Sequence, residues 1–398
     1  MQEADIHEMM RPEVREHLEK VFEMTPEAYA LAHHKSGFPV ALVAGQLKTL
    51  QKARQKLPRM YAARCILPPR AYAQASSEAA ARMKIDVKGE RALDLTAGLG
   101  VDSMALAEAF KEVVAVERDP VLAEVLRFNL KLLGIGNVEV VNAAAEDYVM
   151  GLPAGSFDFI YVDPDRRDQN ARRHHAITDC SPDVLALRDQ LLLAAPQVRF
   201  KLSPMLDVDA LETAFPERQR IAYLSVANEC KEALVELGGD GSPSRAAHFQ
   251  HEAVTHHFET QAPTDPIPNP PTQPSYLLDP DVALYTARIV PQYFRAQFPD
   301  LPGGLHHPSG YFLSETRPEH FPGRIYEILT TLPYKPRTLK AYLKTHHITR
   351  AKIRRRRFDI PIAKLRKTFK LAEGDEHTLL FSRQSDGQRV VYHVQKVK

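Results

Sequence analysis

The chain has 398 residues, of which 44% are hydrophobic, and a formal net charge of +2. This length exceeds what one hydrophobic core usually serves, so we expect two or three domains. The sequence contains no run of 18 apolar residues and starts with the polar segment MQEADIHEMMRPE, which argues against a membrane span or a signal peptide and predicts a cytoplasmic protein.

The cysteines and histidines favour neither a disulfide framework nor a metal site. Cys65, Cys180 and Cys230 are odd in number and far apart, which fits a reducing compartment. Five His-His pairs occur, but they lack the spacing to Cys or to other His residues that metal sites require. We therefore expect no bound metal.

The charge is unevenly distributed along the chain. Residues 335–370 hold 14 Lys and Arg and a single acidic residue, Asp359, so this segment carries +13 and the rest of the chain carries −11. Such polarity predicts a polyanion-binding end attached to a body with another task. The alternative is a solvated basic face or a flexible tail.

The N-terminal 75 residues have helical apolar spacing, for example at Val40, Val43, Leu47 and Leu50. The prolines Pro68 and Pro69 end this helical unit. Ser76 or Ser77 is a natural N-cap for a following short helix, and free amides at that helix start would suit a ligand carboxylate. We include Gln74, Ser76 and Ser77 among the candidate cofactor contacts, with simple capping as the alternative.

From residue 76 to residue 260, strand and helix patterns alternate, which predicts an α/β fold with a mostly parallel sheet covered by helices on both faces. We expect seven strands with an antiparallel end, including a hairpin across Gly238 to Gly241. The expected parallel strands are residues 92–95, 112–116, 138–141, 157–162 and 198–202. Further strand-like runs follow within residues 220–258.

The sequence after residue 260 predicts a linker and two small α+β modules. Residues 261–275 contain six prolines and no apolar periodicity, as in an extended linker. The expected domains are therefore a helical N-terminal unit (1–75), the α/β domain (76–260), the linker (261–275), a segment at 276–345 and a basic module at 346–398.

The stretch RALDLTAGLGVD, residues 91–102, runs from an apolar strand into a glycine turn and then into a helix, which is typical of a nucleotide-binding turn. Gly98 and Gly100 let the backbone approach a ligand, and Asp94 can meet an ammonium group. The dinucleotide spacing GxGxxG is absent because residue 103 is Ser, which disfavours nicotinamide and flavin enzymes. Glu117, which ends the second strand, is placed to accept both hydroxyls of a ribose.

The combination of DLTAGLGVDS, AVERDP and VDPD resembles the class I S-adenosylmethionine-dependent methyltransferases, which have a Rossmann-like, seven-stranded doubly wound sheet. The resemblance implies S-adenosylmethionine as cofactor. It implies that the glycine loop holds the methionine half, that the acid after the second strand holds the ribose, and that acids after the third strand meet the adenine. The cofactor candidates at these places are Asp94, Thr96, Ala97, Gly98, Gly100, Asp102, Glu117, Arg118, Glu146 and Asp147.

The motif Asp163-Pro164-Asp165-Arg166 resembles the Asp/Asn-Pro-Pro-aromatic motif of methyltransferases that act on base amines or amide nitrogens. A carboxylate there would orient the target NH2, so we predict Asp163, Pro164 and Asp165 as catalytic residues. The second Pro and the aromatic residue of that motif are replaced by Asp165 and Arg166. The alternative is that Asp163 only caps the following loop.

Two basic groups are candidates for RNA binding. Arg166, Arg167, Arg172 and Arg173 follow the fourth strand, at the edge of the sheet where ligands bind. The C-terminal segment supplies Arg354, Arg355, Arg356, Arg357, Lys364, Arg366 and Lys367, with Phe358 and Phe369 interleaved for possible base stacking.

The C-terminal segments YLLDPDVAL, HFPGRIYEI and RFDIPIAKLRKTFKLAEGDEHTLLF resemble a bacterial group of class I methyltransferases with a ferredoxin-like segment and a THUMP-like domain. This resemblance implies binding to structured RNA. We therefore predict an S-adenosylmethionine-dependent methyltransferase acting on a base nitrogen of tRNA or rRNA. The alternatives are a methyltransferase of a protein or small molecule and a non-catalytic RNA-binding protein with a vestigial cofactor site. The sequence leaves the oligomeric state open.

Overall fold

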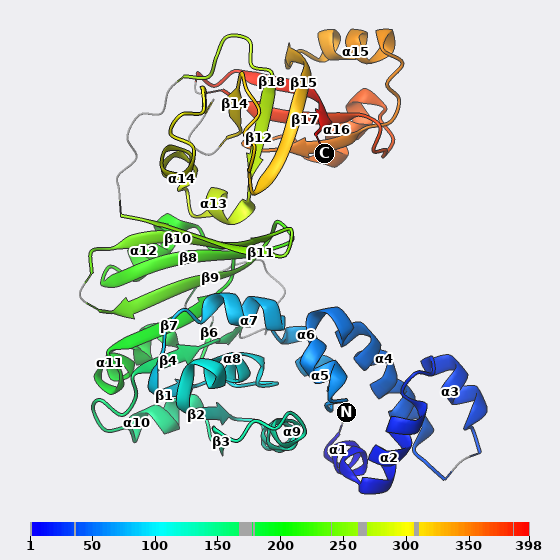
Figure 1. Cartoon of the computed structure of the whole chain (residues 1–398), viewed down its shortest axis with the longest axis vertical. Coiled ribbons are helices and arrows are strands. Elements are labelled where there is room, and N and C mark those ends of the chain that lie inside the picture. Colours follow the sequence, from blue (N-terminus) through cyan, green and yellow to red (C-terminus); the bar gives the residue numbers. More distant parts are fainter. Residues whose placement is uncertain are drawn as a thin grey trace. The chain divides into compact units, whose positions relative to one another are not determined.

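The structure is a computed structural model that describes residues 2–35, 37–166, 177, 180–239, 241–261, 269–305, 310–384 and 386–397 (Figure 1). The chain divides into two compact units. Unit 1 comprises Met1–Leu206, Ala210–Arg220 and Glu232–Gly241, and unit 2 comprises Asp207–Asp209, Ile221–Lys231 and Ser242–Lys398. The five domain boundaries expected from the sequence stay predictions.

Unit 1 begins with six helices, several of which start with a proline, whose fixed φ suits a first helical turn. Their apolar faces bury Ile6, Met9, Leu47 and Leu50 in one cluster that also contains Leu99 of the glycine turn. The N-terminal helices therefore support the glycine turn from behind. Their bounds are α1 (Glu3–Met10), α2 (Pro12–Val21), α3 (Pro26–Ala32), α4 (Val40–Lys56), α5 (Pro58–Ala62) and α6 (Pro69–Gln74).

The larger sheet has the strand order β11-β10-β8-β9-β7-β4-β1-β2-β3. Strands β3, β2, β1, β4 and β7 form one parallel set, and β7 pairs antiparallel with β9 on its other side. The strand bounds are β1 (Gly89–Asp94), β2 (Phe110–Glu117), β3 (Val138–Asn142), β4 (Phe159–Val162), β7 (Gln197–Leu202), β8 (Arg218–Val226), β9 (Glu229–Gly238), β10 (Ser244–His251) and β11 (Val254–Thr260). The α/β fold class predicted from the alternating pattern is confirmed.

The sheet has nine strands rather than the expected seven. Residues 244–260 form two of them, β10 and β11, which pair with each other as a hairpin. The expected hairpin across Gly238 to Gly241 is wrong: β8 lies between β9 and β10 in the sheet. The turn after β8 is Ala227-Asn228 and the turn after β10 is Glu252-Ala253, and all four residues have positive φ. Such turns usually contain glycine, so their sequences gave no turn signal.

The parallel strands are connected by helices that fix a ligand site. The chain moves outward from β1 to β3 and then returns to β4 and β7, so right-handed crossovers place the connecting helices on opposite faces. The direction reverses between β1 and β4, and the carboxyl ends of these strands form the crevice where ligands bind in such sheets. The helices are α7 (Glu78–Lys84), α8 (Val101–Ala109), α9 (Pro120–Leu132), α10 (Ala145–Met150), α11 (Val184–Ala194) and α12 (Val208–Ala214). A short ladder joins β5 (Asp165–Arg166) to β6 (Cys180–Ser181).

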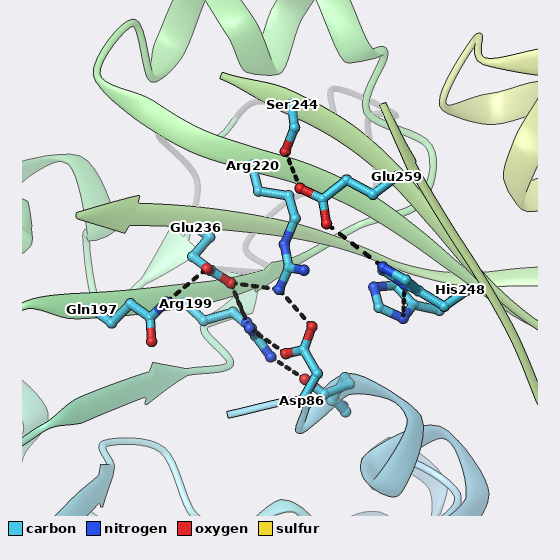
Figure 2. Close-up of polar contacts among 10 residues, drawn as sticks. Asp86, Gln197, Arg199, Arg220, Glu236, Ser244, His248 and Glu259 are labelled. Atoms are coloured by element: carbon cyan, nitrogen blue, oxygen red, sulfur yellow. Dashed lines mark hydrogen bonds and ion pairs between the residues drawn. The ribbon is translucent and has the colours of Figure 1, made fainter. Parts of the chain in front are cut away.

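A buried ion cluster ties three strands of unit 1 to the segment before β1. Figure 2 shows Asp86, Arg199, Arg220 and Glu236 pointing toward one another. Arg199 is 1% exposed, and its Nη2 lies 2.7 Å from Asp86 Oδ1 and 2.5 Å from Glu236 Oε2. Burial raises the pKa of Asp86, but the two guanidinium groups lower it further than burial raises it. The cluster is charge-balanced, as a buried ionic group must be.

Arg199 also donates a hydrogen bond from Nη1 to the backbone carbonyl of Lys84. This contact joins the cluster to the end of α7. In unit 2, Ser244 Oγ donates to Glu259 Oε1 across the hairpin β10–β11 (Figure 2). His257 Nε2 lies 3.6 Å from Glu259 Oε2, and the ring of His257 contacts the ring of His248.

Unit 2 contains a seven-stranded sheet with the order β13-β14-β12-β15-β18-β17-β16. The expected turn at Asp386-Gly387 joins the antiparallel pair β17 and β18, as predicted. The elements are β12 (Tyr276–Pro280), α13 (Val282–Thr286), α14 (Val290–Gln297), β13 (Gly303–Leu305), β14 (Phe312–Ser314), β15 (Gly323–Pro333), α15 (Pro336–Thr345), β16 (Lys352–Arg355), α16 (Ile362–Phe369), β17 (Thr378–Arg383) and β18 (Arg389–Lys396). Because β15 pairs with both β12 and β18, the 276–345 segment and the basic segment share one sheet.

Candidate active site at the carboxyl ends of the parallel strands

A cavity of about 600 Å³ lies in unit 1 where β1, β2, β3 and β4 end. Such a volume is in the range that holds small molecules and cofactors. Its walls come from the glycine turn, the loops after β2 and β3, the Asp163 loop and the α6–α7 connection. The polar residues on its walls are Arg70, Gln74, Ser76, Thr96, Asp102, Glu117, Arg118, Asp119, Glu146, Asp163, Asp165 and Ser181.

The glycine turn adopts a conformation that ordinary residues resist. Gly98 has φ +56° and Gly100 has φ +83°. A Cβ at Gly98 would meet no atom within 4 Å, and Gly98 lines the cavity, whereas a Cβ at Gly100 would lie 2.2 Å from Leu126 Cδ1. The first glycine therefore keeps space open beside the cavity, and the second permits close packing on α9.

Glu117, at the end of β2, lines the cavity and contacts this turn. Its Oε2 accepts a hydrogen bond from Gly98 N at 2.8 Å, and its Oε1 accepts one from Asp119 N at 2.8 Å. A carboxylate has about four acceptor positions, so about two remain for a ligand. Burial raises the pKa of Glu117, and the two backbone donors oppose that change. The Glu117 carboxylate is therefore able to accept hydrogen bonds from two hydroxyl groups of a ligand.

Asp94 is fully buried and does not line the cavity, in contrast to the ammonium contact expected from the sequence. Its Oδ2 accepts from Ser103 Oγ at 2.5 Å, and its Oδ1 accepts from Thr96 N at 3.3 Å. Burial raises the pKa of Asp94 to about 7. Asp94 therefore supports the glycine turn from beneath it.

Asp102, in the first turn of α8, is the carboxylate on the cavity wall at this side. Its Oδ1 pairs with Lys84 Nζ at 2.9 Å, and its Oδ2 accepts from Ser76 Oγ at 3.3 Å and from Tyr161 Oη at 3.3 Å. Burial would raise the pKa of Asp102, but Lys84 lowers it below its ordinary value. Lys84 is fully buried and also pairs with Glu232 at 2.8 Å.

Asp163 follows β4 and lines the cavity next to the glycine turn. Its backbone N–H donates to Thr96 Oγ1 at 2.7 Å, and its Oδ2 lies 2.5 Å from Lys201 Nζ. Burial raises the pKa of Asp163, and the charge of Lys201 opposes this rise. One hydrogen bond thus fixes the distance between the Asp163 loop and the glycine turn.

Most of the predicted cofactor and catalytic residues meet at this cavity. The predicted residues on its walls are Gln74, Ser76, Thr96, Ala97, Gly98, Asp102, Glu117, Arg118, Glu146, Asp163 and Asp165. Ser77, Asp94, Gly100, Asp147 and Pro164 do not line it. Ser77 instead caps α7 by accepting from Ala80 N at 3.1 Å, and Gly100 precedes α8.

Sequence reasoning missed Ile6 and Arg70 on the wall, and Lys84, Tyr161 and Lys201 beneath it. Ile6 belongs to α1, so only the packed structure brings it to the cavity. The two lysines carried a usable signal, because each is a charged residue beside an apolar strand or helix face in ARMKI and VRFKL.

The predicted RNA-binding residues have unequal surroundings. Arg167, Arg172 and Arg173 lie outside the described residues, and of Arg166 only the backbone in β5 is described. In unit 2, Arg355, Arg357, Lys364 and Lys367 are exposed, whereas Arg354 and Arg366 are half-buried.

Arg356 requires a correction, since its side chain is 10% exposed and pairs with Asp279 at 2.8 Å. It also lies over the rings of Tyr285 and Tyr311. Phe358 and Phe369 are core residues, so they are not available to stack on bases. Arg356 therefore anchors unit 2, and the exposed cations nearby are the ones that a ligand can reach.

No described helix combines the length and apolar character needed to span a bilayer. Within the same residues, no group of three or more His, Cys, Asp or Glu side chains is arranged to hold a metal ion.

Comparisons with known proteins agree with this geometry. The family described as "Conserved hypothetical protein 95" matches residues 77–180, and the family described as "THUMP domain-like" matches residues 323–396. The crystal structure of a proposed methyltransferase from Porphyromonas gingivalis W83 is 25% identical, covers 100% of both chains and superposes with a TM-score of 0.79.

Two curated relatives match part of the chain. A tRNA/tmRNA (uracil-C(5))-methyltransferase of Vibrio cholerae is 26% identical over 168 residues, which are 42% of this chain and 40% of that protein. The ribosomal RNA small subunit methyltransferase J of Laribacter hongkongensis is 35% identical over 91 residues, which are 20% of this chain and 32% of that protein. The chain thus spans less than half the length of either relative.

By its fold, its glycine turn with the spaced acid and these matches, the chain is similar to the class I S-adenosylmethionine-dependent methyltransferases. The chain also carries a THUMP-like domain in its C-terminal part. The family resemblance inferred from the sequence motifs is confirmed.

The two glycines of the turn predict different variant phenotypes. Gly98→Ala should fold with a melting temperature within about 5 °C of wild type but lose about tenfold or more of its affinity for S-adenosylhomocysteine, because the methyl group enters space beside the cavity. Gly100→Ala should lower the melting temperature more, because its methyl group meets the buried Leu126 side chain. Thermal melts and calorimetry measure both effects, and wild-type affinity in Gly98→Ala would contradict this assignment.

Proposed function

We propose that this chain transfers a methyl group from S-adenosylmethionine to a base nitrogen of RNA. The observation that carries the proposal is the hydrogen bond from Asp163 N to Thr96 Oγ1, which holds a carboxylate loop next to the glycine turn at one cavity. An acceptor placed by Asp163 would then lie beside a methyl donor placed by that turn.

The cofactor roles follow from the wall residues. Thr96, Ala97 and Gly98 would surround the methionine half, with Asp102 and Ser76 as the polar groups on its side of the cavity. Glu117 would accept hydrogen bonds from the ribose hydroxyls, and Glu146 would lie toward the adenine. The bound cofactor supplies an electrophilic methyl group on a positive sulfur.

The acceptor chemistry follows from Asp163. Its carboxylate would accept a hydrogen bond from the target amine, which directs the nitrogen lone pair toward the methyl carbon. The new N–C bond forms as the C–S bond breaks, the sulfur leaves as a neutral thioether, and the surplus proton on nitrogen passes to Asp163 or to water. No metal or oxidant is needed.

A nitrogen target also accounts for the residues on the cavity wall. Methylation at C5 of uracil, the activity named for the Vibrio relative, needs a nucleophile that adds to the ring before the carbon can attack. Within the described lining of the cavity there is no cysteine. The matched RNA-modifying proteins and the THUMP-like domain support RNA as the substrate class.

The direct test uses cofactor with a labelled methyl group and extracts of cells that lack this protein. We expect label in RNA, and nucleoside digestion followed by mass spectrometry should place it on a base nitrogen. Label in the protein fraction alone would overturn the RNA assignment, and label on a ring carbon would overturn the nitrogen assignment.

The exposed cations of α16 predict a salt-dependent RNA affinity. Lys364→Ala with Lys367→Ala should weaken RNA binding and reduce the slope of log affinity against log salt by about 0.7 to 0.9 for each lost phosphate contact. Lys20→Ala with Lys111→Ala removes two exposed lysines of unit 1 and serves as the matched control. Filter binding over a salt series measures both slopes, and equal slopes in the two variants would remove α16 from the interface.

A further inference from the structure

Lys201 is a charged residue of strand β7 that lies between two buried residues, Phe200 and Leu202. Its strand pairs in parallel with β4, in a register that aligns Val162 with Phe200. The next residues along the chain are therefore Asp163, directly after β4, and Lys201, within β7. Their side chains meet at 2.5 Å, with 29% of the Asp163 side chain and 15% of the Lys201 side chain exposed.

The surrounding charges make Lys201 the direct partner of Asp163. Lys84, the other buried lysine, pairs with Asp102 and Glu232 instead. The groups that act on Asp163 are Lys201 from β7, Lys84 from α7, Asp102 from α8, Asp94 from β1 and Tyr161 from its own strand, and Glu232 from β9 acts on Lys201. Several carboxylates therefore crowd this region, and a nearby cation is needed to keep Asp163 charged.

The contacts of Asp163 also restrain its position. Its backbone is tied to Thr96, and its Oδ2 is tied to Lys201. A carboxylate has two oxygens with about four acceptor positions, so this pairing leaves capacity for a second donor. Because Lys201 belongs to a strand, its ion pair positions Asp163 more precisely than a contact with a loop residue would.

We propose that Lys201 is a positioning residue that keeps Asp163 ionised and oriented to receive the hydrogen bond of the acceptor amine. The inference rests on the proposed function, in which Asp163 contacts the acceptor. It assigns to the motif Asp163-Pro164-Asp165-Arg166 a partner that lies on a different strand, at a position remote in sequence.

The consequence is a specific change in pH dependence. Burial raises the pKa of Asp163, and Lys201 is the strongest group that opposes this rise. Since the ionised form accepts the hydrogen bond, activity should increase with pH through the pKa of Asp163. Removing Lys201 should move this acid limb upward by about one to three pH units, so the loss is large at neutral pH and small in alkali.

The kinetic experiment compares wild type, Lys201→Met, Lys201→Gln, Lys201→Arg and Asp163→Asn with RNA from cells that lack the protein. We expect kcat of Lys201→Met and Lys201→Gln to fall about tenfold or more at pH 7 and to recover toward about pH 9, while Lys201→Arg stays near wild type. In the Asp163→Asn background, Lys201→Met should cause little further loss. A uniform loss at all pH values, or no loss, would overturn the proposal.

A second measurement does not depend on activity. With ¹³C-labelled aspartate, the carboxyl signal of Asp163 is assigned by its absence in Asp163→Asn, and its titration is followed in wild type and in each Lys201 variant. We expect titration at higher pH in Lys201→Met or, where that variant does not fold, in Lys201→Gln. Unchanged titration would refute the role of Lys201, whereas shifted titration in a protein that never methylates RNA would refute the proposed function alone.

Discussion

Replacing Asp163 with alanine is expected to lower kcat for methyl transfer by about 10²- to 10³-fold. The affinity for S-adenosylhomocysteine should stay within about threefold of wild type, which is a change in binding free energy of under about 1 kcal/mol. The effect falls on the chemical step because Asp163 would hold the acceptor, while the cofactor contacts lie on the glycine turn and on Glu117.

The variant Asp163→Asn separates the charge of this side chain from its shape. The amide keeps a carbonyl oxygen that can accept the amine hydrogen bond, but it leaves Lys201 without its carboxylate partner. We expect an intermediate rate whose acid limb is lost. Asp189→Ala, which removes an exposed carboxylate from α11, is the matched control.

Single-turnover kinetics with labelled cofactor would measure these rates, and calorimetry would measure cofactor affinity. If Asp163→Ala transferred methyl groups at the wild-type rate, the acceptor would have to be oriented by other wall residues. If the variant lost cofactor affinity instead, Asp163 would belong to the cofactor site.

Replacing Arg199 with methionine is expected to lower the free energy of unfolding by about 3 to 5 kcal/mol, as breaking a buried ion pair typically does. Arg199 is almost completely buried, and its loss leaves Asp86 and Glu236 sharing Arg220 as their remaining cation in this cluster. One carboxylate would then be a buried charge without full compensation.

The double variant Arg199→Met with Glu236→Met tests this explanation. It removes one charge of each sign and leaves the pair of Arg220 with Asp86, so we expect it to recover part of the lost stability. Lys111→Met, at an exposed pair with Glu90, is the control and should change stability little. Denaturant unfolding provides the free energies. A double variant less stable than Arg199→Met would show that packing, not charge balance, sets the cost.

The Arg199 variant also connects stability to the site. In the wild-type protein, Arg199 Nη1 donates a hydrogen bond to the backbone carbonyl of Lys84, and the ammonium group of Lys84 pairs with Asp102 on the cavity wall. Partial loss of cofactor affinity in both Arg199→Met and the double variant would follow from movement of the α7 end, because both variants lack this hydrogen bond.

Several features of the fold could be predicted from local sequence. The residues Asp94 to Asp102 mark the first strand, its turn and its helix, and Glu117 and Asp163 mark the ends of two further strands. The carboxyl ends of parallel strands meet at one edge of a sheet, so these separate patterns were enough to predict a shared site. Thr96, Gly98, Glu117 and Asp163 do lie around one cavity.

Other features depend on contacts between residues far apart in sequence. Asp94 and Asp102 look equally suited to an ammonium group, but packing buries the first beneath Ser103 and leaves the second on the wall. Arg356 looks like its basic neighbours, but Asp279 and two tyrosines bury it. The turns Ala227-Asn228 and Glu252-Ala253 carry no glycine, although all four residues have positive φ. The pairing of the flanking strands imposes this conformation, and no local pattern predicts it.

The sequence by itself therefore determined the class of sheet, the cofactor turn, the acids at the strand ends and the basic character of the C-terminal part, since each depends on residues within one short segment. The tertiary structure decided which acids face the cavity, which cations remain exposed and that Lys201 pairs with Asp163. These properties depend on burial and on strand register, which bring together residues that no local pattern connects.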